Sequence, residues 1–245
     1  MKRLERKVSI VTGGGSGLGE ATSIVLARAG MRVAVVDLRE EGCGRVADSI
    51  RDQGGDALAL CGDVSDEATV HKVVQQVLGR WDRIDAMINN AAVDHTLSVH
   101  EMTVAQWDQV LAVNLRGPFL FAKAVWPVMM AQHGGHIVNI ASTAAKRAWA
   151  NAAAYHTSKW GLLGFSRGLG VEGRPHNIKV TAIVPGGMRT HFFDRFGEQG
   201  IPLPDPAKLQ DPMCVAELIA FVVSMPPESV LQEAIITPLW ETSWP

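Results

Sequence analysis

Seven short apolar runs constrain the fold of this chain more than any other feature of its sequence. Within each run apolar and polar residues do not alternate, which is typical of strands covered on both faces. Segments of helical length separate the runs, and strand–helix–strand repeats predict a parallel sheet. The runs are Val8–Thr12, Arg32–Asp37, Ala57–Cys61, Ala86–Asn89, His136–Ile140, Lys179–Val184 and Ala234–Pro238. We therefore predict an α/β, doubly wound (Rossmann) fold, with a seven-stranded parallel sheet and helices on both faces.

We expect a single domain spanning residues 1–245. The chain has 245 residues, of which 47% are hydrophobic, and it has no Pro/Gly/Ser-rich linker and no internal repeat. Its net charge of −2 gives no basic field for nucleic acid or an anionic membrane surface. The first apolar run is too short for a signal sequence or a membrane span, which favours a cytoplasmic protein. The three cysteines lie far apart without a CxxC pair, so no metal site is predicted.

The first predicted strand leads into a glycine-rich turn, TGGGSGLG, with Gly13, Gly17 and Gly19. Glycines in such a turn let phosphates approach the backbone amides at a helix N-terminus, which indicates a dinucleotide site. Asp37 ends the second strand, 18 residues after Gly19, near the spacing expected of a carboxylate that binds a ribose 2′-hydroxyl. A carboxylate there repels a 2′-phosphate. NAD is therefore favoured over NADP, although Arg39 lies near enough to soften the preference.

Tyr155 is the only tyrosine of the chain, and Lys159 follows it by four residues, which is about one helical turn. A free phenol has a pKa of about 10, and removing about three units takes roughly 4 kcal/mol. One positive charge about 4 Å away supplies energy of that order. The pair can therefore act as an acid/base at neutral pH. A solvated lysine beside a half-buried tyrosine is the structural alternative.

Other polar residues are predicted at the carboxyl edge of the sheet, where ligands of doubly wound folds bind. Asp63 follows the third strand and either caps a turn or contacts the adenine end of a nucleotide. Asn90 ends the fourth strand region, and Ser142 ends the fifth, 13 residues before Tyr155. Asn114 interrupts an apolar helix face just before Gly117-Pro118, where we expect a kink.

The segment 187–212 is too long for a plain connector and is predicted to cover the carboxyl edge as a lid. It carries Phe192, Phe193 and Phe196, which we expect to line an apolar substrate space. Asp211-Pro212 is predicted as N-cap and first residue of the last helix. An earlier helix carries glycines 161, 164 and 168 in one stripe, which predicts close helix contact either across a symmetric dimer or within the subunit.

In order and spacing, TGGGSGLG, NNAA, Asn114, Ser142, YHTSK and PGGMRT resemble the classical short-chain dehydrogenases/reductases. The likeness runs from Val8 to about Thr190. The resemblance implies that Tyr155 exchanges a proton with the substrate oxygen and that Lys159 lowers its pKa and binds the nicotinamide ribose. It implies that Ser142 polarises the carbonyl and that Asn114 holds a water in a proton relay.

The resemblance also implies which residues hold the dinucleotide. The glycine turn carries the pyrophosphate, residues after the second and third strands carry the adenosine, and residues after the sixth strand carry the nicotinamide. The implied set is Gly13, Ser16, Gly17, Leu18, Gly19, Asp37, Leu38, Asp63, Val64, Asn90, Ala91, Tyr155, Lys159, Pro185, Gly186, Met188 and Thr190. It includes no metal ligand.

The chain departs from the family pattern in three places. Ala92 stands where glycine is usual after NNA, and Gly168 and Gly170 stand where helix formers are commoner. The C-terminus lacks the usual Asp-Gly-Gly ending and carries Trp240 and Trp244 instead. Exposed tryptophans are unfavourable in water, so we expect the tail 239–245 to pack either on a neighbouring subunit or on its own.

The residues and the resemblance together predict an NAD(H)-dependent oxidoreductase that interconverts a secondary alcohol and a ketone. An NADPH-dependent 3-oxoacyl-(acyl-carrier-protein) reductase is the alternative enzyme, which Asp37 disfavours. A non-catalytic dinucleotide-binding sensor is the alternative from another class, which the intact acid/base set disfavours. A homo-oligomer, tetramer or dimer, is expected. The sequence does not identify the substrate.

Overall fold

The seven predicted strands form one parallel sheet in the spatial order β3-β2-β1-β4-β5-β6-β7, within the part of the chain that the structure describes. The computed structural model describes residues 4–194, 196, 201 and 203–241. The strands are β1 (Val8–Thr12), β2 (Arg32–Asp37), β3 (Ala57–Cys61), β4 (Ala86–Asn89), β5 (Gly135–Ile140), β6 (Ile178–Pro185) and β7 (Glu233–Ile236). The first four have the predicted bounds, and β5 and β6 begin one residue earlier than predicted.

The last strand ends two residues before its predicted end. Pro238 lies outside β7, which stops at Ile236 opposite the last residue of β6, Pro185. Beyond that point β7 has no strand to pair with, and proline has no N–H to donate to a ladder. The chain turns instead, and the Glu241 N–H donates to the Pro238 carbonyl at 3.0 Å.

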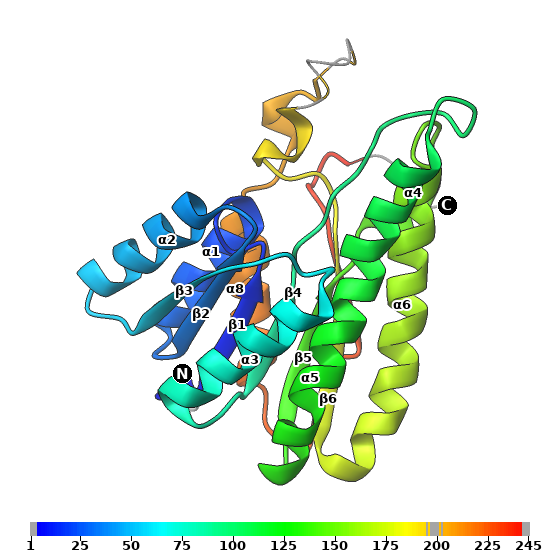
Figure 1. Cartoon of the computed structure of the whole chain (residues 1–245). Helices are drawn as coiled ribbons and strands as arrows, with labels where there is room; N and C mark the ends of the chain where they lie inside the picture. Colours follow the sequence, from blue (N-terminus) through cyan, green and yellow to red (C-terminus); the bar gives the residue numbers. More distant parts are fainter. Residues whose placement is uncertain (1–3, 195, 197–200, 202, 242–245) are drawn as a thin grey trace.

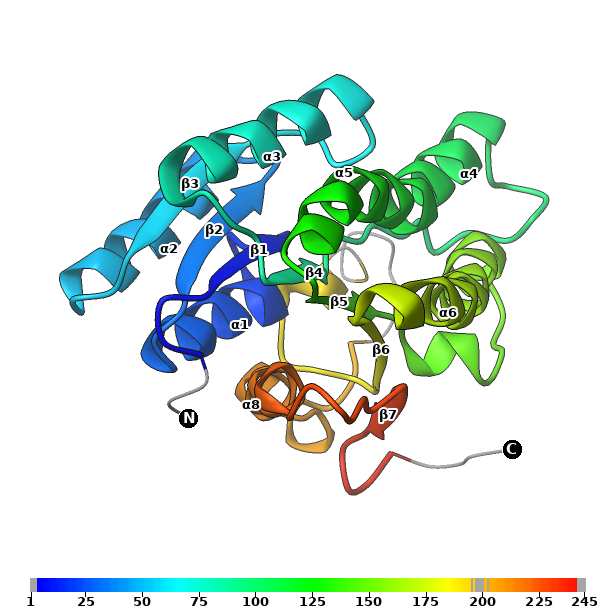
Figure 2. The ribbon, with the colours of Figure 1, turned by 90° about the horizontal axis from the view of Figure 1, so that it is seen from below.

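Helices cover both faces of the sheet (Figures 1 and 2). On one face lie α1 (Gly17–Arg28), α2 (Glu40–Asp52) and α8 (Pro212–Ser224). On the other lie α3 (Glu67–Trp81), α5 (Gly117–Ala131) and α6 (Ala153–Gly173), and α4 (Val104–Leu111) continues the line of α5. The predicted doubly wound fold is therefore confirmed. None of the described helices is both long and apolar enough to cross a membrane.

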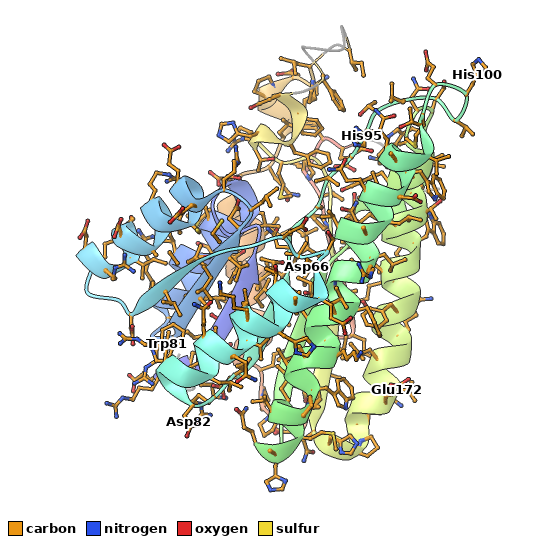
Figure 3. All side chains as sticks on the ribbon, viewed as in Figure 1. Asp66, Trp81, Asp82, His95, His100 and Glu172 are labelled. Atoms are coloured by element: carbon orange, nitrogen blue, oxygen red, sulfur yellow. The ribbon has the colours of Figure 1, made fainter. Side chains whose placement is uncertain are left out.

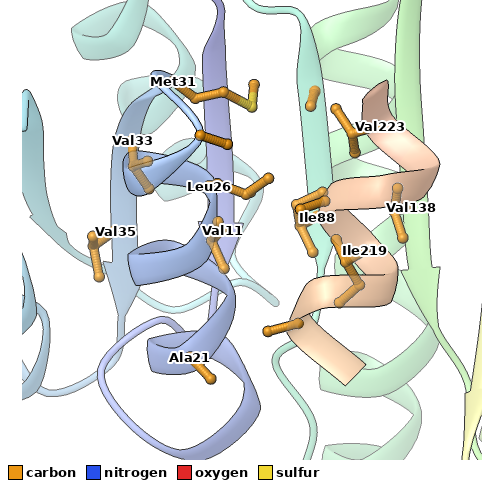
Figure 4. Close-up of a cluster of buried hydrophobic side chains, with 14 of the residues drawn as sticks. Val11, Ala21, Leu26, Met31, Val33, Val35, Ile88, Val138, Ile219 and Val223 are labelled. Carbon is orange, nitrogen blue, oxygen red and sulfur yellow. The ribbon is translucent and has the colours of Figure 1, made fainter. Parts of the chain in front are cut away.

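Each face of the sheet contributes to its own hydrophobic core. Val11 and Ile88 pack with Leu26 of α1 and Ile219 of α8 on one face (Figure 4). Ile10, the strand residue next to Val11, packs into the cluster on the other face. Because both faces are buried, these strands need apolar residues at consecutive positions, which explains why they do not alternate.

Helix α3 shows how local sequence fixes the ends of an element, as the labelled residues of Figure 3 illustrate. The Asp66 carboxylate caps its first turn by accepting the Thr69 N–H at 2.8 Å. At the other end Asp82 is left-handed, with φ of 58°, and stops the helix. The Trp81 indole N–H donates to Asp56 at 2.9 Å.

The segment 187–212 and the tail are described in part. The described portion of the former includes two short 3-10 turns, His191–Phe193 and Pro206–Lys208. Asp211 caps α8 as predicted and accepts the Met213 N–H at 2.8 Å. Trp244 and residues 195, 197–200 and 202 lie outside the described residues.

The three glycines of the α6 stripe lie in two different environments. A Cβ on Gly161 would lie 3.0 Å from Leu115 of the same chain, so this glycine permits close contact within the subunit. A Cβ on Gly164 or Gly168 would meet nothing within 4 Å among the described residues, apart from the adjacent backbone of α6 itself. The predicted contact within the subunit is therefore found at Gly161 alone.

A chain of buried amides fastens the middle of the sheet to α6. The Asn89 amide of β4 donates to Asn139 of β5 at 2.8 Å, and the Asn139 amide donates to Ser166 of α6 at 2.9 Å. The Ser166 hydroxyl donates to the Leu162 carbonyl at 2.7 Å. All three side chains are buried, so each depends on this chain for hydrogen bonding.

Replacing Asn139 by leucine is expected to lower the free energy of unfolding by about 3 kcal/mol, because a buried Asn89 donor then loses its acceptor. Urea unfolding followed by circular dichroism measures this difference. Gln76→Leu, an exposed change of the same kind on α3, should stay within about 0.5 kcal/mol of the wild type. Equal stabilities of the Asn139 variant and wild type would contradict the assignment.

Candidate active site

A cavity of about 850 Å³ lies along the carboxyl edge of the sheet. It runs from the turn after β1, past the ends of β2 and β3, to Ser142, Tyr155 and the end of β6. Every residue that the sequence predicted for catalysis or dinucleotide binding lines it, except Gly19 and Asn114. The topology accounts for this, because the strand order reverses between β1 and β4 and opens a crevice there.

The glycine turn has the backbone geometry that a phosphate cradle requires. Gly13 and Gly17 have φ of 60° and 54°, in the left-handed region that favours glycine. A Cβ on Gly19 would lie 2.0 Å from the Gly13 carbonyl oxygen, so only glycine fits there. Gly19 thus acts by close packing rather than by lining the cavity. The turn ends at the N-terminus of α1, which favours an anion, and a dinucleotide pyrophosphate fits this site.

Asp37 is held at the edge of the cavity by two backbone amides. Its carboxylate accepts the Gly15 N–H at 2.9 Å and the Arg39 N–H at 3.0 Å, and it is 9% exposed. Leu38 beside it is 68% exposed and also lines the cavity. These contacts fix the position of the carboxylate at the edge of the cavity.

Asp63 lines the same end of the cavity but also holds a turn. One carboxylate oxygen accepts the Ser65 N–H at 2.8 Å and the Ser65 hydroxyl at 2.7 Å. Val64, which follows it, packs against Gly117 of α5. The capping alternative is therefore found, and a cofactor role for Asp63 remains a prediction.

Helix α6 brings Tyr155 and Lys159 to the far end of the cavity. Tyr155 is 8% exposed, and the Lys159 ammonium lies 5.5 Å from the centre of its ring. Lys159 Nζ donates to the Ile140 carbonyl at 2.8 Å, which ties the helix to the end of β5. Ser142 follows β5 and accepts the Ala144 N–H at 3.1 Å. These three residues bring a phenol, an amine and an aliphatic hydroxyl to one end of the cavity.

Burial lowers the pKa of Lys159 from 10.5 to about 7, because the charged amine loses its water. A phenolate beside it would restore the preference for the ammonium.

Asn114 braces the site from behind. It lies in a π-helical turn, Ala112–Arg116, between α4 and α5, just before the predicted kink at Gly117-Pro118. Its side chain accepts the Val93 N–H at 2.8 Å and donates to the Val93 carbonyl at 2.8 Å. It also donates to Ser158 at 3.1 Å, and Ser158 donates to the Tyr155 carbonyl at 2.8 Å. Asn114 thus joins the segment after β4 to the turn of α6 that carries Tyr155 and Lys159.

His156 makes a second brace, which sequence reasoning missed. Its Nε2 accepts the Trp149 N–H at 3.1 Å, so Nδ1 carries the proton and donates to the Ala144 carbonyl at 2.7 Å. The ring therefore fastens the turn after Ser142 to the first turn of α6. The only feature of the sequence that pointed to a role for His156 was its position next to Tyr155.

The predicted phenylalanines all line the cavity. The Phe192 ring lies 5.6 Å from the Tyr155 ring, and Phe193 stacks edge-on against Phe192 at 5.7 Å. Phe196 follows at 5.3 Å from Phe193. The segment 187–212 therefore places an aromatic wall against Tyr155.

Several polar residues at this end of the cavity were not predicted. They are Asp94, Thr96, Gln109, Arg147, Trp149 and Glu241. Arg147 forms an ion pair with Glu241, and the Glu241 carboxylate accepts the Gly187 N–H at 2.9 Å. No local spacing signals a contact across 94 residues. Among the described residues, no group of three or more His, Cys, Asp or Glu side chains is placed to hold a metal ion.

Comparisons with known proteins agree on a family. The model of the short chain dehydrogenase family matches residues 7–200. Levodione reductase of Leifsonia aquatica is 37% identical over 80% of this chain and 75% of its own length. D-threitol dehydrogenase of Mycolicibacterium smegmatis is 38% identical over 75% of this chain and 70% of its own.

Solved structures of related proteins superpose closely. A metagenomic short-chain oxidoreductase in complex with NADP is 30% identical, with a TM-score of 0.85 over 98% of this chain and 100% of its own. The 3-ketoacyl-(acyl-carrier-protein) reductase of Brucella melitensis, complexed with NADH, is also 30% identical, with a TM-score of 0.87 over 96% of this chain and 98% of its own. Both forms of the dinucleotide thus occur among these neighbours.

Replacing Lys159 by methionine is expected to stabilise the protein free of dinucleotide, by about 3 kcal/mol at or below pH 7. Between pH 7 and 10.5 the unfolded chain binds more protons at this amine than the folded chain, so wild-type stability rises with pH across that window. The advantage of the variant should therefore shrink as the pH approaches 10.5.

Urea unfolding of both proteins across this pH range measures the effect. Lys123→Met, which removes an exposed lysine, should show no such pH dependence. A stability difference for Lys159→Met that is independent of pH would contradict the prediction.

Proposed function

This chain belongs to the short chain dehydrogenase family, and from that premise we propose that it is an NAD(H)-dependent oxidoreductase that interconverts a secondary alcohol and a ketone. One observation carries the proposal: Tyr155, Lys159 and Ser142 line one end of the cavity whose other end is formed by the glycine turn and Asp37. The relatives named above, a reductase and a dehydrogenase, support chemistry at a CH–OH group.

Each group of the catalytic end has a proposed role. The Tyr155 hydroxyl passes a proton to the substrate oxygen in reduction and takes it back in oxidation. The Lys159 ammonium stabilises the phenolate form, and the Ser142 hydroxyl donates to the carbonyl oxygen. A bound dinucleotide supplies the hydride. The residues of this chain supply position, charge and the proton.

Asn114 has a positioning role in this proposal. Its side chain holds both the segment after β4 and Ser158 of α6, so it fixes the turn that carries Tyr155 and Lys159. The predicted proton relay through a water near Asn114 is retained as part of the proposal.

The proposed preference for NAD rests on Asp37. Its carboxylate is held by two amide donors at the end of β2, where it can accept a hydrogen bond from a ribose 2′-hydroxyl and would repel a phosphate. Arg39 also lines this end of the cavity, and its charge opposes that repulsion in part.

A homo-oligomer, dimer or tetramer, is also proposed. Exposed apolar side chains on the outer faces of α5 and α6 support it: Phe119, Trp160 and Val171 are 47%, 53% and 59% exposed. Gly164 and Gly168 leave open space on α6 where a neighbouring helix can approach.

Tyr155→Phe is expected to lower kcat by about 10²- to 10⁴-fold while leaving NADH affinity within about threefold, because it removes only the hydroxyl that exchanges the proton and keeps the ring. NADH and NADPH oxidation with a panel of ketones measures turnover, and fluorescence titration measures binding. The wild type should prefer NADH. Glu172→Gln, an exposed change on the same helix, should match the wild type. Binding of NADH by both proteins without turnover of any ketone would favour a dinucleotide sensor.

Asp37→Asn keeps an acceptor for the Gly15 N–H but removes the charge. We expect the ratio of dissociation constants for NADPH and NADH to shift toward NADPH by about 10-fold or more, since the repulsion of a 2′-phosphate is lost. Asp63→Asn, on the neighbouring strand end, is the matched control and should leave the ratio near its wild-type value. An unchanged ratio in Asp37→Asn would rule out this basis for selectivity.

A further inference from the structure

The C-terminal tail places a carboxylate at the substrate end of the cavity. After β7 the chain turns at Pro238, and the Glu241 side chain, 13% exposed, lines the cavity. One of its oxygens pairs with the Arg147 guanidinium, and the other accepts the Gly187 N–H at 2.9 Å. The flanking Leu239 and Trp240 are 87% and 70% exposed, so the side chain that faces inward is the charged one.

Arg147 belongs to the catalytic loop itself. It follows Ser142 by five residues, and its guanidinium lies 5.8 Å from the centre of the Trp149 ring. Trp149 in turn packs edge-on against His156, whose ring braces the first turn of α6. The ion pair therefore stands beside the catalytic constellation and is fixed to it through one short loop.

A second set of ion pairs fastens β7 to the same loop without involving Glu241. Glu233 of β7 pairs with Lys146, the residue before Arg147, and with Arg167 of α6 at 3.3 Å. Neither Glu233 nor Lys146 lines the cavity. Of the two carboxylates that hold this loop, only Glu241 is in a position to meet a substrate.

The charge at this end of the cavity disfavours an anionic substrate. Glu241 compensates the Arg147 charge, and Asp94 adds a second carboxylate, which accepts the Thr96 hydroxyl at 3.2 Å. An ionised carboxylate accepts up to about four hydrogen bonds, so Glu241 retains acceptor capacity beyond its two protein partners. The groups that match such a surface are hydroxyls, which donate to carboxylates and accept from a guanidinium.

The remaining wall is aromatic. Trp149 and Phe192 both line the cavity, and the Phe192 ring contacts the Tyr155 ring. Aromatic faces pack well against the C–H groups of a hydroxylated carbon chain, while its hydroxyls turn toward polar groups.

We propose that Glu241 and Arg147 form a hydroxyl-recognition subsite and that the substrate is a polyhydroxylated alcohol or its keto form, that is, a polyol or sugar. This inference rests on the proposed alcohol–ketone activity and names its substrate class. Glu241 is thereby a specificity-determining residue supplied by the C-terminal tail.

The test compares four-carbon substrates in the oxidative direction: a tetraol such as threitol, butan-2-ol, and 3-hydroxybutyrate. Wild type should have its highest kcat/KM with the tetraol. In Glu241→Gln the ratio of kcat/KM for the tetraol to that for butan-2-ol should fall by about 10- to 100-fold, mainly through KM, since a charged acceptor is replaced by a neutral one. Glu233→Gln removes a carboxylate that pairs with the same loop but lies outside the cavity. This variant should leave the ratio unchanged.

Three outcomes overturn the proposal. A wild-type preference for butan-2-ol or 3-hydroxybutyrate would refute the substrate class while leaving the alcohol–ketone activity intact. An unchanged ratio in Glu241→Gln, with both substrates affected alike, would reduce Glu241 to an anchor of the loop. If wild type binds NADH, as seen by fluorescence titration, but oxidises none of the three and reduces no ketone, the proposed function itself fails and the inference fails with it.

Discussion

The buried ammonium of Lys159 is the interaction on which the catalytic end depends. It donates to the Ile140 carbonyl at the end of β5 and lies over the Tyr155 ring, so one group joins the sheet, the helix α6 and the proposed acid/base. Burial lowers its pKa to about 7, which makes its charge responsive to any anion formed beside it. A solvated lysine on an exposed helix face would keep its charge at neutral pH whatever its neighbour did, and it would stabilise a phenolate far less.

A cation in such a place has to be held by rigid surroundings, because its burial is unfavourable. The structure supplies hydrogen bonds that hold α6 at several points. Asn114 reaches the helix through Ser158, and His156 ties its first turn to the turn after Ser142. The amides of Asn89 and Asn139 hold it further along, through Ser166. None of these six bracing side chains lines the cavity. Their effect is geometric: they fix the rotamers and the distances that proton transfer requires.

The two ends of the cavity are built in different ways. At the nucleotide end, backbone groups form the contacts. Glycines allow the turn after β1 to pack closely on itself, and backbone amides hold the Asp37 carboxylate. At the substrate end, side chains from the loop after β5, the segment after β6 and the C-terminal tail meet. The first arrangement suits a ligand common to a family, and the second suits selectivity, because loops and tails change without disturbing the sheet. The Arg147–Glu241 pair belongs to this second group.

The sequence by itself determined the sheet and most of the cavity lining. Apolar runs bounded by glycine and aspartate gave four strands with their observed ends, and the motifs at strand ends fell on one edge because parallel strands end on the same side. Only the tertiary structure decided that Asn114 acts through Ser158, that Gly161 alone of its stripe contacts its own chain, and that Glu241 reaches Arg147. The physical reason is the separation along the chain over which each kind of signal acts. Periodicity and spacing report on neighbours within a turn or a strand, whereas these contacts join segments whose register is set only when the core packs.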